Sequence, residues 1–441
     1  MAMYGEVLRY CHAFRKWVVW DGQRWKVDDV DHSRVLAHKM MTAFAMQALK
    51  ANADEKVIKF AASCRRTARI TNCLREAEPL LPITPAELDT HPFLLNFLNG
   101  TLDLRTGELR PHKRDHFISK LVYHKYNPQA QCPLFLRFLN RIMGCHPDAS
   151  LGELERADRL VDYLQRALGC SMAGETIEKV VFFLYGAGDN GKTTLLSTFL
   201  HLLQEYAELL QVDTLMVRQE SNNTQADLAD LRGARFVMTS ETEDGQRLAE
   251  GKLKRITQGM GKIKAVRKYE NPIEFQETHK LFIDANHLPV VRGTDNAIWN
   301  RLHPVPFNIT IPKEEQDKEL QAKLLAEAEG ILAWAAQGAR RWYAEGLGNP
   351  PDVEKANKTW RAESDRLGRF LDDSCVVREN ALVQARPLYS AYKKWAEEGG
   401  EWSESEKKFA DRMKERGFLK TPRNTGRVYL GLELRVKGEG S

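Results

Sequence analysis

The chain has 441 residues, of which 43% are hydrophobic and 28% are charged, and its formal net charge at pH 7 is +5. This length predicts about two to four domains, and no run approaches the roughly 18 uncharged apolar residues that a membrane span requires. The start, "MAMYGEVLRYCHAFRKW", has no apolar secretory core, so we expect a cytoplasmic protein with no membrane contact. The seven cysteines form no C-x-x-C pair, which predicts reduced thiols and argues against a zinc site.

The first 130 residues predict a small mixed α+β domain. Turn residues Asn99-Gly100 and Thr106-Gly107 lie between short alternating runs, a pattern typical of a β-hairpin. A helical region is predicted from Pro133 to Leu168, because its apolar residues recur at spacings of three and four.

The stretch Gly186–Thr193 fits G-x-x-x-x-G-K-[S/T] at every fixed position, between an apolar run and a helical pattern. Glycines bring backbone N–H groups close to an anion, and a helix N-terminus adds its positive dipole end. Lys192 is expected to reach the β- and γ-phosphates and Thr193 to hold Mg²⁺, so the pattern predicts a site for ATP with Mg²⁺. The residues expected to contact the nucleotide are Gly186, Ala187, Gly188, Asp189, Asn190, Gly191, Lys192, Thr193 and Thr194.

Polar residues end two later predicted strands. Glu241 and Glu243 follow the apolar run Phe236–Met238, where carboxylates can bind Mg²⁺ and orient the attacking water, and Glu241 is the expected metal ligand. Asn286 ends the predicted strand Leu281–Ala285, where it can position water near the γ-phosphate.

Basic residues concentrate in two segments, although the chain as a whole is nearly balanced. Seven basic residues and one acid lie between Lys252 and Glu270, giving +6, and ten basic residues and three acids lie between Lys407 and Lys437, giving +7. Such patches indicate contact with a polyanion, although a solvated charged face is the alternative for either patch. In the first segment, glycines at 259 and 261 before alternating residues predict a hairpin with a basic tip. Its candidate DNA-binding residues are Lys262, Lys264, Arg267 and Lys268.

The second basic segment lies in a small C-terminal unit. Ser403–Glu406 predicts a capping box that opens a helix, and Gly417 is expected to end it. A hairpin turn is predicted at residues 424–426. A helix followed by a basic hairpin is typical of a winged helix, which would bind duplex DNA through Lys407, Lys408 and Arg412, or alternatively dock a protein.

Taken together, these motifs resemble the superfamily III helicases of the AAA+ type, in the branch of phage, plasmid and poxvirus primase–helicases. The resemblance covers most of residues 75–435, and the motif combination is specific. The stretches that carry it are "GAGDNGKTT", "SETED", "THKLFIDANHLPVVRGTDNAIWNRL", "PVPF", Leu88–His112, Leu388–Gly400 and Phe409–Leu434.

The resemblance implies further roles. Asn286 would be the polar sensor, and Arg301 the arginine finger that reaches a neighbour's nucleotide, with Arg292 as the alternative. The basic hairpin would project into the channel of a homo-hexamer that moves 3′ to 5′ on single-stranded DNA. Many relatives carry a primase domain, which needs paired carboxylates. Asp29 and Asp31 lie in a short turn-like context, so we expect a helicase that lacks its own primase and depends on a separate primase or polymerase.

The predicted fold is therefore α/β, with an AAA+ P-loop ATPase core, a mixed α+β N-terminal domain and a C-terminal winged helix. The predicted domains are residues 1–130, 131–345 and 346–441. The expected function is ATP-dependent unwinding of forked DNA during replication of a phage, plasmid or other mobile element, in the cytoplasm of a bacterial host if so encoded. The alternatives are an origin-binding initiator that uses ATP as an assembly switch, and an NTPase of another class, such as a DNA-packaging motor or a small-molecule kinase.

Overall fold

The computed structural model describes residues 4–217, 228–242, 245–259, 261–266, 272–293, 295–400, 403–423 and 426–435, with the backbone alone for residues 240–242. The chain divides into two compact units. Unit 1 comprises Met1–Pro289 and Asn300–Glu354, and unit 2 comprises Val290–Trp299 and Lys355–Ser441. The short insert Val290–Trp299 therefore clusters with the C-terminal residues, although it connects two strands of unit 1. The predicted boundaries at 130 and 345 stay predictions.

Unit 1 is built on a five-stranded parallel sheet with the order β13-β7-β12-β9-β8. The first strand of this sheet along the chain is β7. It has a neighbouring strand on each side, and every residue but its last is buried, as its unbroken apolar sequence VFFLY predicts. Three phenylalanines from adjacent strands (182, 236 and 282) pack together, with ring centroids 4.6 and 4.9 Å apart. The strands are β7 (Val181–Tyr185), β8 (Ala207–Leu210), β9 (Phe236–Thr242), β12 (Lys280–Ala285) and β13 (Leu302–Pro306).

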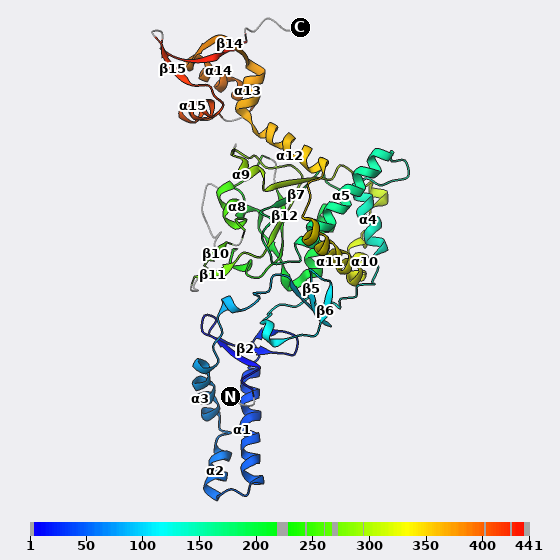
Figure 1. Cartoon of the computed structure of the whole chain (residues 1–441), viewed down its shortest axis with the longest axis vertical. Coiled ribbons are helices and arrows are strands. Elements are labelled where there is room, and N and C mark those ends of the chain that lie inside the picture. The colour runs from blue at the N-terminus through cyan, green and yellow to red at the C-terminus, as the bar shows by residue number, and fades with distance from the viewer. Residues whose placement is uncertain are drawn as a thin grey trace. The chain divides into compact units, whose positions relative to one another are not determined.

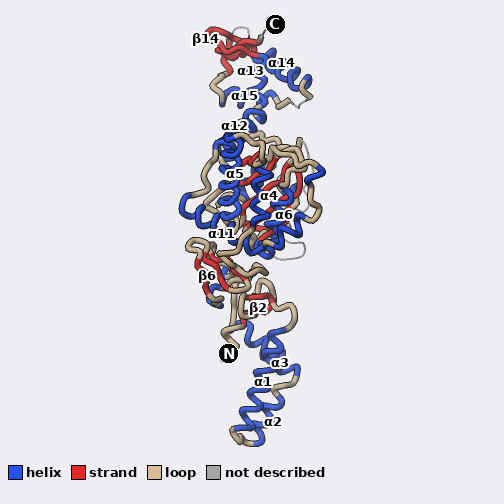
Figure 2. Tube along the Cα trace, turned by 90° about the vertical axis from the view of Figure 1, so that its right-hand side faces the viewer, coloured by secondary structure: helices blue, strands red, loops and turns tan. Residues whose placement is uncertain are grey.

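Helices surround this sheet, as the blue tubes around the red strands in Figure 2 show. Helix α6 packs on β8, β9 and β12, and α5 lies beside α11. The close approach of α5 and α11 depends on glycine, because a Cβ added to Gly338 would meet the carbonyl oxygen of Gln165 at 2.0 Å. The helices are α4 (Pro133–Met143), α5 (Leu151–Cys170), α6 (Lys192–Leu203), α8 (Glu250–Ile256), α10 (Leu320–Ala326) and α11 (Ala328–Glu345).

The N-terminal part of unit 1 contains two small antiparallel sheets and three helices. The hairpin predicted at residues 99–112 is confirmed, with Leu102 paired to Leu109, and a third strand extends it. Asp29 and Asp31 lie on an exposed turn before α1, where Lys16 contacts Asp29. The elements are β1 (Leu8–Cys11), β2 (Lys16–Trp20), β3 (Trp25–Val27), α1 (His32–Lys50), α2 (Glu55–Ser63), α3 (Thr67–Ala77), β4 (Leu94–Phe97), β5 (Gly100–Asp103) and β6 (Glu108–Arg110).

Unit 2 packs helices against a three-stranded antiparallel sheet of order β14-β16-β15 (Figure 1). Its core includes Phe370, Tyr392, Phe409 and Met413, of which the last two are the positions expected to face inward. Helix α12 (Pro351–Ser364) begins in unit 1 and continues into unit 2. The other elements are α9 (Asn296–Trp299), α13 (Arg366–Ser374), β14 (Cys375–Gln384), α14 (Ala385–Glu398), α15 (Glu406–Glu415), β15 (Lys420–Arg423) and β16 (Gly426–Leu434).

One predicted helix start in unit 2 is wrong by two residues. The N-cap of α15 is Ser405, whose hydroxyl accepts a hydrogen bond from the Lys408 backbone N–H, rather than Ser403. Residue Glu404, which would lie in the first turn if the helix began at Ser403, is instead buried and pairs with Arg412. The predicted end is confirmed, because Gly417 follows the C-cap with φ of +87°.

Candidate nucleotide site and basic hairpin

The glycine loop connects β7 to α6, as the sequence predicts, and its geometry requires glycine. Gly188 and Gly191 have φ values of +89° and +82°, in the left-handed region that side chains disfavour. A Cβ on Gly186 would meet the Phe307 carbonyl oxygen at 2.1 Å, and one on Gly191 would meet Ile142 at 2.7 Å. The loop therefore needs glycine both for its left-handed backbone conformation and for its close packing against neighbouring residues. Its Asp189 carbonyl accepts a hydrogen bond from Ile311 at 2.7 Å, which ties the loop to the chain after β13.

Lys192 is buried, with 2% of its surface exposed, at the N-terminus of α6. Its Nζ donates to the Gly186 carbonyl at 2.9 Å, to Asn190 Oδ1 at 2.9 Å and to Asn286 Oδ1 at 3.3 Å. Asn286 follows β12 directly, and β12 is the neighbour of β7 in the sheet. The structure thus brings together the loop lysine and the strand-end asparagine, which lie 94 residues apart in the sequence.

Asp284 is a site residue that the sequence analysis missed. It is 1% exposed near the end of β12, and its Oδ2 accepts a hydrogen bond from Thr193 Oγ1 at 2.5 Å. Its Oδ1 lies 4.0 Å from Lys192 Nζ. The available signal was an acid inside the otherwise apolar strand "LFIDA", since a buried carboxylate needs a cationic or hydrogen-bonding partner.

Glu241 lies at the same edge of the sheet. Ile283 pairs with Thr239 and Ala285 pairs with Thr242, so β9 has one extra residue opposite Asp284, which is a β-bulge. The side chain of Glu241 and the whole of Glu243 lie outside the described residues. In the part of the chain that the structure describes, no three His, Cys, Asp or Glu side chains gather as metal ligands. A threonine hydroxyl and one or two carboxylates fit Mg²⁺, which usually takes few protein ligands together with phosphate oxygens and water.

Arg301 lies at the N-terminal ends of the parallel strands, whereas the glycine loop lies at their C-terminal ends. Its carbonyl accepts a hydrogen bond from Val181, the first residue of β7, whereas the loop follows the last. The five residues of β7 separate these two ends of the sheet by about 16 Å, a distance that an arginine side chain cannot span. Arg301 therefore cannot reach the glycine loop of its own chain. Arg292, the alternative finger, belongs to unit 2.

The predicted basic hairpin is confirmed as β10 (Lys262–Ala265) paired with β11 (Ile273–Gln276). The side chains of Lys262 and Lys264 are 67% and 81% exposed, and both lie near Glu274, at 3.0 and 3.6 Å. Exposed pairs of this kind contribute little stability, so both ammonium groups remain accessible to another anion. Arg267 and Lys268 lie outside the described residues.

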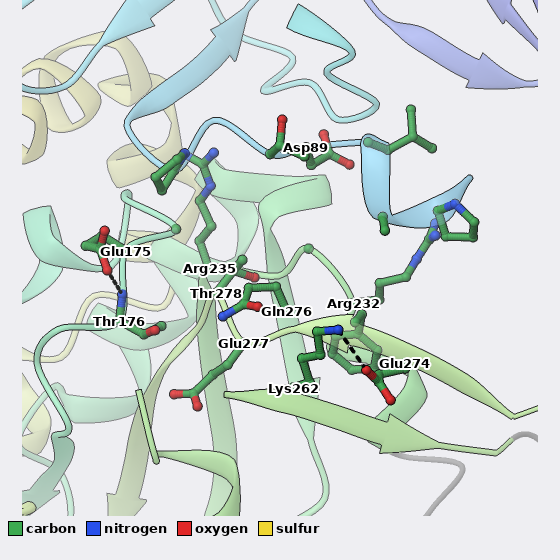
Figure 3. A pocket seen from close by; sticks show the side chains of 18 of the residues that line it. Asp89, Glu175, Thr176, Arg232, Arg235, Lys262, Glu274, Gln276, Glu277 and Thr278 are labelled. Atoms are coloured by element: carbon green, nitrogen blue, oxygen red, sulfur yellow. Dashed lines mark hydrogen bonds and ion pairs between the residues drawn. The ribbon is translucent and has the colours of Figure 1, made fainter. Parts of the chain in front are cut away.

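A pocket of about 420 Å³ lies at the base of this hairpin. Figure 3 shows the paired Lys262 and Glu274 at one wall, with Arg232 close by and Glu277 on the same strand segment. Glu277 joins the two ends of the hairpin: its N–H donates to the Gly261 carbonyl at 2.9 Å, and its carboxylate accepts from the Gly259 N–H at 3.2 Å. Burial raises the pKa of Glu277 to about 7.

We expect Glu277→Gln to make the protein's stability less dependent on pH. The raised pKa means that the folded state keeps the proton between pH 4.5, the ordinary value, and about 7. Stability from this group is present at low pH and is lost as the pH rises through 7, by on the order of 3 kcal/mol. Glutamine stays neutral and keeps an acceptor for Gly259, so its unfolding midpoint relative to wild type should rise between pH 5 and pH 8.

The matched control for this prediction is Glu274→Gln on the exposed side of the hairpin, whose pKa is lowered by Lys262 rather than raised. Buried His279, with a pKa lowered to about 4 by desolvation, destabilises the protein at acid pH in every variant, so it cancels in the comparison. Midpoint differences between wild type and Glu277→Gln that stay constant from pH 5 to pH 8 would show that Glu277 does not titrate as described.

The C-terminal candidates differ in accessibility. Lys407 and Lys408 are exposed on α15, as expected for residues that bind DNA. Arg412 is mostly buried, with 17% of its side chain exposed, and contacts Glu404 at 3.3 Å and the Arg292 carbonyl. Arg412 therefore has a structural contact that the sequence analysis did not foresee. Among the described residues, no helix combines the length and apolar composition needed to cross a bilayer.

Comparison with known protein families matches three segments of the chain. The model described as "D5 N terminal like" matches residues 1–144, a family of unknown function (DUF5906) matches 184–301, and "Poxvirus D5 protein-like" matches 362–430. The last of these lies within unit 2, and the second includes the whole glycine loop.

Similar curated proteins include helicase-named and primase-named proteins of viruses. The chain is 25% identical over 329 residues to "Putative helicase L207/L206" of Acanthamoeba polyphaga mimivirus, covering 70% of this chain and 33% of that protein. It is 25% identical over 235 residues to "Primase D5" of fowlpox virus, covering 51% and 28%. The chain thus spans about a third of the length of these relatives. Among solved structures, the apo C-terminal region of NrS-1 shares the fold, with a TM-score of 0.51 at 11% identity and 96% coverage of both chains.

The family matches and the helicase-named relatives together support a helicase or primase–helicase family for this chain. More narrowly, the D5 matches near both ends of the chain and the relatives named as a helicase and as primase D5 support a D5-type primase–helicase of superfamily III.

Proposed function

We propose that the protein is an ATP-dependent DNA helicase that translocates on single-stranded DNA during replication of a viral or other mobile element. The observation that carries the proposal is the presence, in one compact unit, of a complete glycine loop and an exposed basic hairpin. A small-molecule kinase has no use for such a hairpin. The helicase names of the viral relatives support the same activity.

In this proposal unit 1 contains an AAA+ core, supported by the parallel sheet with its glycine loop on the interior strand β7. The loop N–H groups and the Lys192 ammonium hold the phosphates, and Asn286, which contacts Lys192, positions the attacking water. Mg²⁺ supplies neutralisation of the phosphate charge that develops during transfer. Thr193 and Asp284, with Glu241 at the same sheet edge, are the residues that would hold the ion.

The proposed assembly is a ring, and we expect a hexamer that moves 3′ to 5′. The support is the position of Arg301, because a finger at the far edge of the sheet acts only on the nucleotide of a neighbouring subunit. Unit 2 is proposed to be a winged helix that contacts DNA, since α13, α14 and α15 share a core with a three-stranded sheet ending in the hairpin β15–β16.

Replacing both Lys262 and Lys264 with alanine is expected to abolish unwinding of forked DNA. The two exposed ammonium groups contact backbone phosphates in this proposal, so their loss weakens single-strand binding at every sequence. Each lost contact lowers the slope of log affinity against log salt by roughly 0.7 for single strands. The measurement is a salt titration of single-strand binding together with an unwinding rate on a fork.

Arg255→Ala is the matched control, because Arg255 is an exposed basic residue of the same segment that lies on α8, outside the hairpin. Normal unwinding by the Lys262 and Lys264 double variant would contradict the proposed role. A wild-type protein that hydrolyses ATP on duplex DNA but does not unwind a fork would instead fit an origin-binding initiator that uses ATP as an assembly switch.

A further inference from the structure

A small pocket in unit 2 is lined by an unusual number of arginines. Its volume is about 120 Å³. Its charged lining residues are four arginines and one aspartate, namely Arg292, Arg361, Arg412, Arg416 and Asp365. The remaining lining residues are Val291, Gly293, Trp299 and Ser364. The lining therefore carries a formal charge of +3, and the nearby Glu404, which pairs with Arg412, reduces it to +2.

The arginines around this pocket are held in place by contacts that fix their orientation. Arg361 donates to Asn296 at 2.9 Å and lies over the Trp299 ring at 5.8 Å. Arg416 pairs with Asp365, and Asp365 in turn caps α13 by accepting from Gly368 at 3.1 Å. Side chains that are already ordered lose little entropy when a ligand binds. The cluster is thus preorganised for an anion rather than a set of free surface charges.

The size of the pocket limits the ligand. Pockets for whole drug-sized molecules are about 300–1,000 Å³, and a water molecule takes about 30 Å³ in the liquid. A volume near 120 Å³ is well below that range and suits a small anionic group rather than a whole nucleotide. Guanidinium groups bind phosphate oxygens in pairs of parallel hydrogen bonds, which makes phosphate the best match among common anions.

We infer that this pocket, hereafter the arginine pocket, binds one backbone phosphate of duplex DNA. The inference rests on the DNA-binding part of the proposed function. Free phosphate has the same chemistry, but the arrangement of α15 favours the polymer. Lys408, Arg412 and Arg416 are spaced by four residues, so they follow one face of the helix at steps of about 6 Å. This basic row extends from the arginine pocket toward the exposed Lys407 and Lys408, which a single free ion would not need.

Only a few residues of the chain separate the wall of the arginine pocket from the candidate nucleotide site. Arg292 and Gly293 form part of its wall, and Arg292 is six residues beyond Asn286, the residue that contacts Lys192. The intervening chain enters unit 2 at Val290. A phosphate bound here therefore restrains the segment that follows the nucleotide sensor, which is a physical route by which DNA bound to unit 2 alters hydrolysis.

The test compares duplex DNA binding by the full-length wild type and Arg361→Gln/Arg416→Gln over a range of salt concentrations. Loss of one phosphate contact lowers the slope of log affinity against log salt by about 0.9, and affinity near 0.1 M salt should fall about tenfold. Arg361→Gln alone keeps the Arg416–Asp365 pair and should show a smaller loss of the same kind. Arg378→Gln is the control, because Arg378 is an exposed arginine of unit 2, on β14, that does not line the arginine pocket.

An unchanged slope in a folded double variant would overturn the inference. A second arm titrates inorganic phosphate against thermal unfolding. If phosphate stabilises the wild type but not the double variant, while duplex binding is the same in both, the pocket holds free phosphate and the DNA assignment is wrong. Single-strand binding through the basic hairpin is measured separately, so failure of the helicase proposal is distinguishable from failure here. A wild type that unwinds forks but binds no duplex would overturn only the present inference.

Discussion

Replacing Lys192 with alanine is expected to abolish ATP hydrolysis while leaving the fold intact. The Lys192 ammonium lies among the Gly186 carbonyl, Asn190 and Asn286, at the position where the loop would hold the β- and γ-phosphates. It offsets charge that develops in the transition state, and removing one such preorganised group costs about 10²–10³-fold in rate. DNA-stimulated hydrolysis and circular dichroism should be measured on the same preparation.

The control for Lys192 is Lys323→Ala in the same unit, where the ammonium pairs with Asp317 at the surface, 47% exposed. That change should leave hydrolysis and unfolding close to wild type, because exposed ion pairs contribute little. Near-normal turnover by a well-folded Lys192→Ala protein would mean that the loop from Gly186 to Thr193 is not the nucleotide site.

Local sequence patterns predicted the parts of this site that depend on short-range geometry. The glycine loop could be found because two glycines, a lysine and a hydroxyl must occupy fixed positions between a strand and a helix. The basic hairpin was predictable for a similar reason, since Gly259, which adopts φ of +72°, lies three residues before the start of β10. Both features are encoded in fewer than twenty consecutive residues.

What the sequence did not predict depends on pairing between distant segments. Asp284 becomes a partner of Thr193 only because β12 is the neighbour of β7, and no pattern within either strand states that order. The insert Val290–Trp299 joins unit 2 through contacts between distant residues. One example is the hydrogen bond that the Asn357 side chain donates to the Trp299 carbonyl at 3.1 Å, between residues 58 positions apart. The helix start at Ser405 was missed because Ser403 satisfies the S-x-x-E pattern and Ser405 does not. Tertiary packing decided the outcome in each case.

Arg301→Ala is expected to stop hydrolysis while sparing nucleotide binding and ring formation. Arg301 directly precedes β13, at the ends of the strands that are remote from the glycine loop. Within one chain it therefore has no access to the phosphates. An arginine finger supplied by a neighbour is worth 10³–10⁵-fold in rate in comparable systems, so the variant should lose about 10³-fold or more. Nucleotide affinity, measured separately, should change little, because the groups that hold the phosphates lie on the other side of the interface.

Mixing Arg301→Ala with Lys192→Ala subunits distinguishes action in trans from a role within the chain. Ring interfaces are heterologous, so each pairs the loop of one subunit with the finger edge of the next. An interface has both groups intact when its loop belongs to an Arg301→Ala subunit and its finger belongs to a Lys192→Ala subunit. In an equal random mixture this holds for roughly a quarter of the interfaces. Hydrolysis should therefore reappear on mixing two inactive proteins. If mixed rings form and no ratio recovers hydrolysis, Arg301 is not the finger, and Arg292 becomes the candidate. That result would place the finger in unit 2, on the wall of the arginine pocket, and would make DNA bound there a direct regulator of the neighbouring nucleotide site.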